Sequence, residues 1–190
     1  MAIIVVGGSA KNVGKTTLVC GLIAALDSLR LTAVKITTDA HHGLAPIYEE
    51  KCAGPATDTA RYLAAGAERA FLLTGPPEGD LAEALEEFWP LIGRGANLIF
   101  ESNRVMNHLN VDTCLMVREN QPEKPRFTKC LNLSTVHFVD AHVVRDAEDH
   151  AFGWEFGDDE PSCPIFHLKD FAHISDEMKG WLMKRPGLAP

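Results

Sequence analysis

The residues best placed to do chemistry are Lys15 and Thr16, which follow a glycine-bearing loop near the start of the chain. The apolar, β-branched residues 3–6 predict a buried strand before this loop, and the apolar residues 18–26 predict a buried helix after it. Such a loop can cradle phosphate, because backbone N–H groups and the helix N-terminus point inward as donors. Lys15 would bring a positive charge to the terminal phosphates, and Thr16 a hydroxyl for Mg²⁺. The predicted phosphate-binding residues are Gly8, Lys11, Asn12, Val13, Gly14, Lys15, Thr16 and Thr17.

The glycine spacing of this loop departs from the common pattern. That pattern has a glycine five positions before Gly14, but Ser9 occupies the position and Gly8 lies one residue earlier. The alternative is a chance Gly-Lys-Thr in an ordinary turn. The strand before the motif and the helix after it favour the phosphate-binding interpretation.

Two acidic residues could complete a magnesium site beside this loop. Glu101 directly follows the apolar residues 98–100, so its carboxylate is expected at the rim of a sheet; an exposed loop acid is the alternative. Asp58 lies in the first turn of a helix predicted over 57–66, where compensation of the helix dipole is the better explanation from the pattern alone. Mg²⁺ takes one or two protein carboxylates plus water and phosphate oxygens. The predicted metal-site residues are Thr16, Asp58 and Glu101.

Other polar residues also follow strands. Lys35 lies near the end of a strand predicted over 31–37 and would bring a cation to the same crevice, or else lie at a solvated strand end. Asp39 and Arg118 are expected at the same edge. His41 and His42 lie in a long polar loop over 37–57, without a second ligand pair at metal spacing, so we expect surface histidines. The predicted catalytic set is Lys15, Lys35, Asp58 and Glu101.

Strands and helices alternate along the chain. Strands are predicted over 31–37, 70–74, 97–100, 113–117, 135–139 and 164–168, and helices over 15–29, 57–66, 80–92 and 173–183. His137 and His142 flank an apolar strand and are expected to be structural, whereas residues 145–160 form an acidic, solvated segment. The alternation implies an α/β fold with a mostly parallel sheet covered on both faces. The length of 190 residues predicts a single domain over 1–190.

Composition narrows the class of protein. The formal charge of −8 and the lack of a basic stripe argue against a nucleic-acid partner. No run approaches the roughly 20 apolar residues of a membrane span, and we expect no cleaved signal because the chain opens into a core strand. The five cysteines show no C-x-x-C pair, which argues against a disulfide framework or a zinc ribbon. We therefore expect a cytoplasmic protein.

Four stretches in the same order give the chain a family resemblance. They are GKTTL (14–18), VKITTD (34–39) followed by Ala-His-His, GPATDTARYLAAGAER (54–69) and LIFESNR (98–104). With these stretches the chain resembles the molybdopterin-guanine dinucleotide biosynthesis protein B (MobB) family over residues 3–118, whereas 119–190 diverge. Ser102 replaces the glycine that the family has after the acid, and Ile36-Thr37-Thr38 replaces part of its histidine stretch. The loop spacing is similar to that of dethiobiotin synthetase instead.

Both resemblances imply a three-layer αβα P-loop NTPase fold, with Lys15, Thr16, Lys35, Asp58 and Glu101 in one site. The MobB resemblance implies a homodimeric protein that binds GTP or ATP with Mg²⁺, hydrolyses it slowly, and serves as an adaptor in molybdenum cofactor biosynthesis with a protein partner. The alternatives are an ATP-dependent ligase or kinase of the dethiobiotin-synthetase type, and a nucleotide-binding module that does not hydrolyse its ligand.

Overall fold

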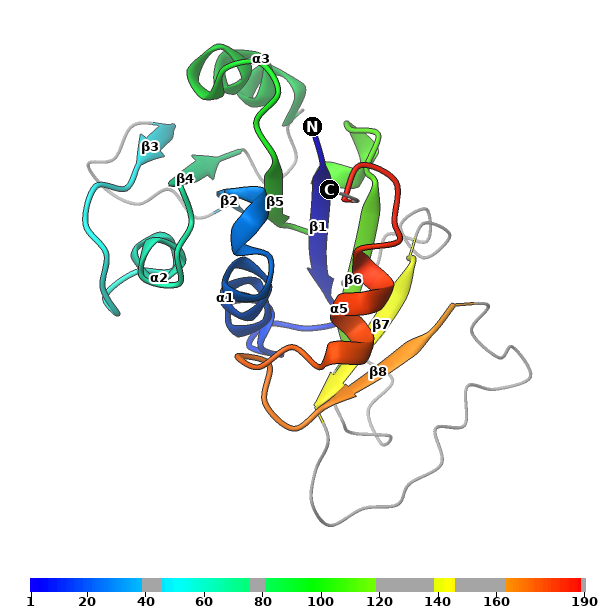
Figure 1. The fold of residues 1–190 in the computed structure, drawn as a ribbon. Coiled ribbons are helices and arrows are strands. Elements are labelled where there is room, and N and C mark those ends of the chain that lie inside the picture. The colour runs from blue at the N-terminus through cyan, green and yellow to red at the C-terminus, as the bar shows by residue number, and fades with distance from the viewer. Residues whose placement is uncertain (39–45, 76–80, 119–138, 146–162, 189–190) are drawn as a thin grey trace.

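The central feature of the computed structural model is an eight-stranded sheet with helices on both faces (Figure 1). The structure describes residues 1–38, 46–75, 81–118, 139–145 and 163–188. The strand order is β3-β4-β2-β5-β1-β6-β7-β8. Every neighbouring pair is parallel except β3 and β4. The strands are β1 (Ile3–Gly8), β2 (Thr32–Thr37), β3 (Ile47–Glu49), β4 (Arg69–Thr74), β5 (Leu98–Glu101), β6 (Thr113–Arg118), β7 (Ala141–Arg145) and β8 (Ile165–Leu168).

Two apolar layers pack against this sheet, one on each face. The helices are α1 (Lys15–Ala25), α2 (Asp58–Ala64), α3 (Leu81–Ile92) and α5 (Asp176–Leu182), with short 3-10 helices over Asp27–Leu29 and Val105–Asn107. Alternation along β1 sends Ile4 and Val6 into the core with α1, α2 and α5, and Ile3 and Val5 into the core with α3. The predicted three-layer α/β fold with a mostly parallel sheet is confirmed.

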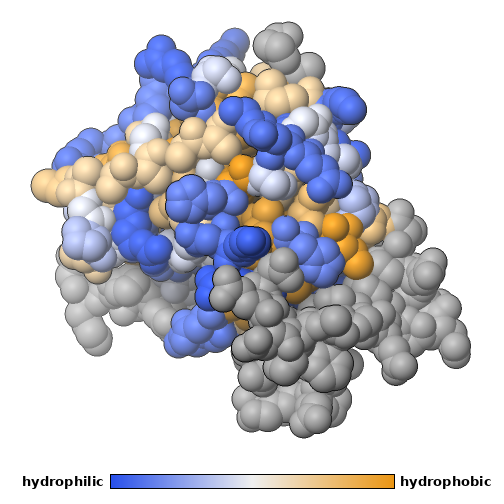
Figure 2. Space-filling model, turned by 60° about the horizontal axis from the view of Figure 1, so that its bottom comes forward, coloured by the Kyte–Doolittle hydropathy of each residue, from blue (hydrophilic) through white to orange (hydrophobic). Residues whose placement is uncertain are grey.

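The outer surface is mostly polar, and the helices that cover the sheet are short. On the face drawn in Figure 2, hydrophilic residues cover most of the described surface, and hydrophobic patches lie between them. None of the described helices is long and apolar enough to span a membrane.

The first and the last helix are both shorter than predicted. The first helix ends at Ala25, because the chain tightens into the 3-10 turn over Asp27–Leu29 and then takes a left-handed conformation at Arg30, with φ of 50°. The last helix begins at Asp176, since the Ser175 side chain accepts a hydrogen bond from the Met178 N–H and caps the helix.

Two short strands were not expected from the sequence. β3 lies within the predicted 37–57 loop as a three-residue edge strand paired antiparallel with β4. Of the strand predicted over 135–139 the structure describes only Val139, which lies outside any strand, so the prediction is wrong at that residue. The sheet contains β7 a few residues later instead. A histidine at the second position of β7 and the shortness of β3 weaken the apolar pattern that a strand normally shows. Asp39, His41, His42 and His137, residues 119–138 and most of the acidic segment lie outside the described residues.

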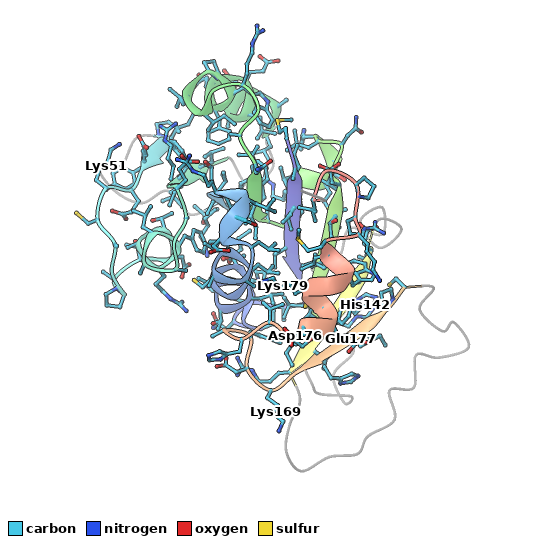
Figure 3. All side chains as sticks on the ribbon, in the orientation of Figure 1. Lys51, His142, Lys169, Asp176, Glu177 and Lys179 are labelled. Atoms are coloured by element: carbon cyan, nitrogen blue, oxygen red, sulfur yellow. The ribbon has the colours of Figure 1, made fainter. Side chains whose placement is uncertain are left out.

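Arg118 and His142 pair where β6 and β7 run side by side. Arg118 Nε donates to His142 Nδ1 at 3.0 Å, so the buried imidazole acts as an acceptor in its neutral form. Burial, aided by the positive charge of Arg118, lowers the pKa of His142 from 6.5 to about 4. His142 is structural, as predicted, and Figure 3 shows it on the β7 side of the molecule.

This pair predicts an acid-sensitive fold. Between about pH 6.5 and 4 the unfolded chain takes up a proton at residue 142 that the folded chain does not. The free energy of unfolding should therefore decrease as the pH is lowered from 6.5 to 4, by about 3 kcal/mol from this group. Urea titrations of His142→Gln should show a shallower pH dependence than wild type. His167, an exposed histidine on β8, is the control. An equal change in the pH dependence of His167→Gln would contradict the assignment of this effect to His142.

Candidate active site

The loop between β1 and α1 has the backbone shape of a phosphate cradle. Gly14, at the N-cap of α1, has φ of 101°, a left-handed conformation that favours glycine. A Cβ at Gly14 would lie 2.6 Å from the Phe171 ring, and one at Gly8 would lie 2.8 Å from the Lys15 side chain. Both glycines are therefore needed for the loop to pass so close to its neighbours.

Backbone pairing explains why serine is tolerated at position 9. The Ser9 N–H donates to the Val117 carbonyl at 2.9 Å, which continues the pairing of β1 with β6 past Gly8. Ser9 is not among the described residues with positive φ, so no glycine is required there. Asn103 holds the preceding residue on the other side: Gly8 N–H donates to Oδ1 and Nδ2 donates to the Gly8 carbonyl, both at 2.8 Å.

The sheet register brings Lys35 and Glu101 together. They are direct partners on the neighbouring parallel strands β2 and β5, and both lie on the face covered by α1 and α2. Lys35 Nζ donates to Glu101 Oε1 at 2.9 Å and also to Asp58 Oδ2 from the first turn of α2. Burial alone would lower the pKa of Lys35, but the charges and hydrogen bonds of Glu101 and Asp58 outweigh it and raise that pKa. Lys35 is thus a fixed cation between two carboxylates.

Glu101 accepts hydrogen bonds from side chains on three different elements of the site. Its side chain is only 4% exposed, and its Oε2 accepts hydrogen bonds from Thr16 Oγ1 at 2.8 Å and from the Tyr62 hydroxyl. Tyr62 is fully buried on α2, and burial together with the negative charge of Glu101 raises its pKa well above the ordinary value. Tyr62 therefore stays protonated and acts as a donor to Glu101.

A cavity of about 660 Å³ lies over these groups. It is lined by ten of the predicted residues: Gly8, Lys11, Asn12, Gly14, Lys15, Thr16, Thr17, Lys35, Asp58 and Glu101. Five basic side chains and two acidic ones line it in a chain of charge −8, so positive charge is concentrated where an anion would bind. Val13 does not line the cavity but packs against the core around α1. Arg118 also lies apart from it, because its guanidinium pairs with His142.

The chemistry of these side chains fits Mg²⁺. Thr16 Oγ1 and Glu101 Oε2 are 2.8 Å apart, close to the separation of about 2.9 Å between adjacent octahedral ligands at 2.0–2.1 Å from Mg²⁺. Among the described residues, no group of three His, Cys, Asp or Glu side chains could hold a metal by itself. A magnesium ion that keeps water and phosphate ligands needs no such group.

Sequence reasoning missed Tyr62, Arg61 and Asn103. Arg61 lines the cavity, and its Nη2 lies 3.5 Å from Thr17 Oγ1 and its Nη1 3.6 Å from Asp58 Oδ1. A signal for two of them existed, because Arg61 and Tyr62 are three and four positions after Asp58 and so share its helix face. No comparable spacing pointed to Asn103.

Loss of the Tyr62 hydroxyl should destabilise the fold. Tyr62→Phe removes a donor from a buried carboxylate, so we expect the free energy of unfolding to fall by about 1–3 kcal/mol. Tyr48→Phe, which removes the same atom from a partly exposed β3 side chain, should change it by less than about 0.5 kcal/mol. Denaturant unfolding measures both variants, and equal effects would argue against the role given to Tyr62.

Comparison with known proteins shows the fold. No family model matches the chain, and no curated protein matches its sequence. The structure is similar to that of Helicobacter pylori HypB in complex with nickel, with a TM-score of 0.65 and 18% identity over 96% of this chain and 86% of that chain. It is also similar to Aquifex aeolicus LpxK in complex with ATP, with a TM-score of 0.58 and 16% identity over 88% of this chain and 53% of that chain. The chain thus spans about half the length of that LpxK chain.

A MobB homologue from Bacillus stearothermophilus is matched as well, with a TM-score of 0.47 and 20% identity over 96% of each chain. The similarity to HypB and LpxK, together with the strand, loop and helix at the start of the chain, gives this protein the fold of P-loop NTPases.

Proposed function

We propose that this protein binds a nucleoside triphosphate with Mg²⁺ in the cavity at the end of β1 and hydrolyses it slowly. The observation that carries the proposal is the hydrogen bond between Thr16 and the buried Glu101, which brings a hydroxyl and a carboxylate to Mg²⁺-ligand separation beside the loop. The P-loop fold and the excess of basic side chains around the cavity support a polyanionic ligand. ATP, with which LpxK was crystallised, is one candidate ligand, and GTP is the other.

In this proposal each side chain has a separate task. The loop N–H groups and Lys15 hold the phosphates, and Thr16 and Glu101 would hold Mg²⁺, which supplies charge neutralisation of the β- and γ-phosphates. Asp58 orients a water or a metal-bound ligand, and Lys35 fixes both carboxylates in position. Positioning and charge stabilisation, without a covalent step on the protein, suffice for slow phosphoryl transfer to water.

We further propose a MobB-like role, as an adaptor in molybdenum cofactor biosynthesis whose turnover depends on a protein partner. The four stretches shared with that family support this role. A kinase or ligase is the second candidate, because a smaller cavity of about 330 Å³ adjoins the first and could hold a second substrate. Stimulation of phosphate release by a protein partner favours the adaptor, whereas stimulation by a small molecule favours the kinase or ligase. The homodimer and the cytoplasmic location stay predictions.

Removal of the loop lysine tests the proposed ligand. Lys15→Ala deletes the charge that faces the terminal phosphates, so affinity for ATP and GTP should fall roughly 10- to 100-fold or more while the fold is kept. Calorimetric titration with Mg²⁺ present measures the affinities. The exposed Lys179 on α5 (Figure 3) provides the control, and Lys179→Ala should bind as wild type does. Unchanged affinity in folded Lys15→Ala would remove the basis of the proposal.

A further inference from the structure

A second cavity, of about 330 Å³, adjoins the nucleotide cavity. The two share Lys35, Asp58 and Arg61, so the Asp58 carboxylate and its cations form the wall between them. The remaining wall comes from β3, from Leu72 on β4 and from the segment that leads into α2. At about 30 Å³ per water the cavity has room for roughly eleven waters, enough for a small metabolite.

Glu50 gives this cavity a carboxylate held by neutral donors. Its Oε1 accepts from the backbone N–H groups of Lys51 and Cys52 at 3.1 and 3.2 Å. Its Oε2 accepts from the hydroxyls of Thr57 and Thr59 at 3.0 and 3.2 Å. Burial opposes ionisation, but these hydrogen bonds outweigh it and lower the pKa of Glu50. The carboxylate is therefore fixed in position and negatively charged.

The nearby cations are engaged with other carboxylates. The Lys51 ammonium pairs with Glu49 at 2.6 Å and lies at the outer edge of the β3 side of the molecule (Figure 3). Lys35 and Arg61 both pair with Asp58 at the shared wall. Among the described ion pairs none involves Glu50, so its negative charge is held by neutral hydrogen-bond donors and not by a paired cation. Tyr48, Pro55, Ala56 and Leu72 supply apolar surface beside it.

We propose that this cavity binds a small molecule with a protonated amine, whose ammonium group contacts Glu50 and whose apolar body packs against Tyr48 and Leu72. A fixed carboxylate beside apolar and aromatic surface is complementary to such a ligand. Binding itself does not depend on a nucleotide. The position of the ligand next to Asp58 would make it a second substrate for the nucleotide cavity, and that step rests on the second candidate function, the kinase or ligase.

Three probes with the same five-carbon chain test this proposal: pentane-1,5-diamine, pentane-1,5-diol and glutarate. Calorimetry on the full chain should give a dissociation constant in the millimolar range or tighter for the diamine, and binding at least about tenfold weaker for the diol and glutarate. Glu50→Gln should weaken the diamine about tenfold. Ala56→Trp should abolish binding by filling the cavity.

Ala53→Trp is the matched control, since Ala53 is also exposed in this segment but lines neither cavity. It should bind the diamine as wild type does. No heat of binding from the diamine at concentrations of about 20 mM would overturn the proposal. Equal binding by wild type, Glu50→Gln and Ala56→Trp would also overturn it, because the diamine would then lie elsewhere on the acidic surface.

ATP and GTP titrations of the same samples separate this proposal from the proposed function. If the diamine binds but neither nucleotide does, the amine subsite stands and the nucleotide function fails. If a nucleotide binds but the diamine does not, the nucleotide function stands and the amine subsite fails.

Discussion

The site depends on a single buried anion, the carboxylate of Glu101. A carboxylate removed from water is unfavourable unless it is paired and hydrogen-bonded. Here Thr16 at the start of α1, Tyr62 on α2 and Lys35 on β2 all donate to it. These interactions fix the start of α1, the helix α2 and the strands β2 and β5 relative to one another around the Glu101 carboxylate. The phosphate cradle, the cation and the candidate metal ligands are thereby positioned before any ligand arrives.

The sheet topology makes this convergence possible. β1 lies next to β5, and β5 next to β2, all parallel, so their carboxyl ends reach the same edge of the sheet. That edge is where ligands bind in open α/β folds. The excess of basic side chains there contrasts with the acidic chain as a whole. The local excess of positive charge therefore attracts an anionic ligand to this edge, although the acidic chain as a whole repels anions at long range.

Much of this arrangement could be predicted from the sequence, because it depends on short-range patterns. The strand, loop and helix around Gly14 each follow a recognisable sequence pattern, Lys35 lies near the end of an apolar strand, and Glu101 follows another. The spacing of Tyr62 from Asp58 places both on one helix face, but the sequence does not reveal that the Tyr62 hydroxyl contacts Glu101. The contact of Asn103 with the loop and the inward packing of Val13 could not be predicted either, because they depend on how the loop meets β5 and the core. β7 was missed because the Arg118 partner that makes a buried histidine acceptable comes from another strand.

The most direct measurement is the metal dependence of nucleotide affinity in Glu101→Gln. ATP and GTP are titrated into wild type and variant with Mg²⁺, with Mn²⁺ in place of Mg²⁺, and without either metal. If Glu101 is a metal ligand, the gain in affinity that wild type obtains from the metal should fall about tenfold or more in the variant. The same metal-dependent gain in both proteins would contradict a magnesium nucleotide site built on Glu101.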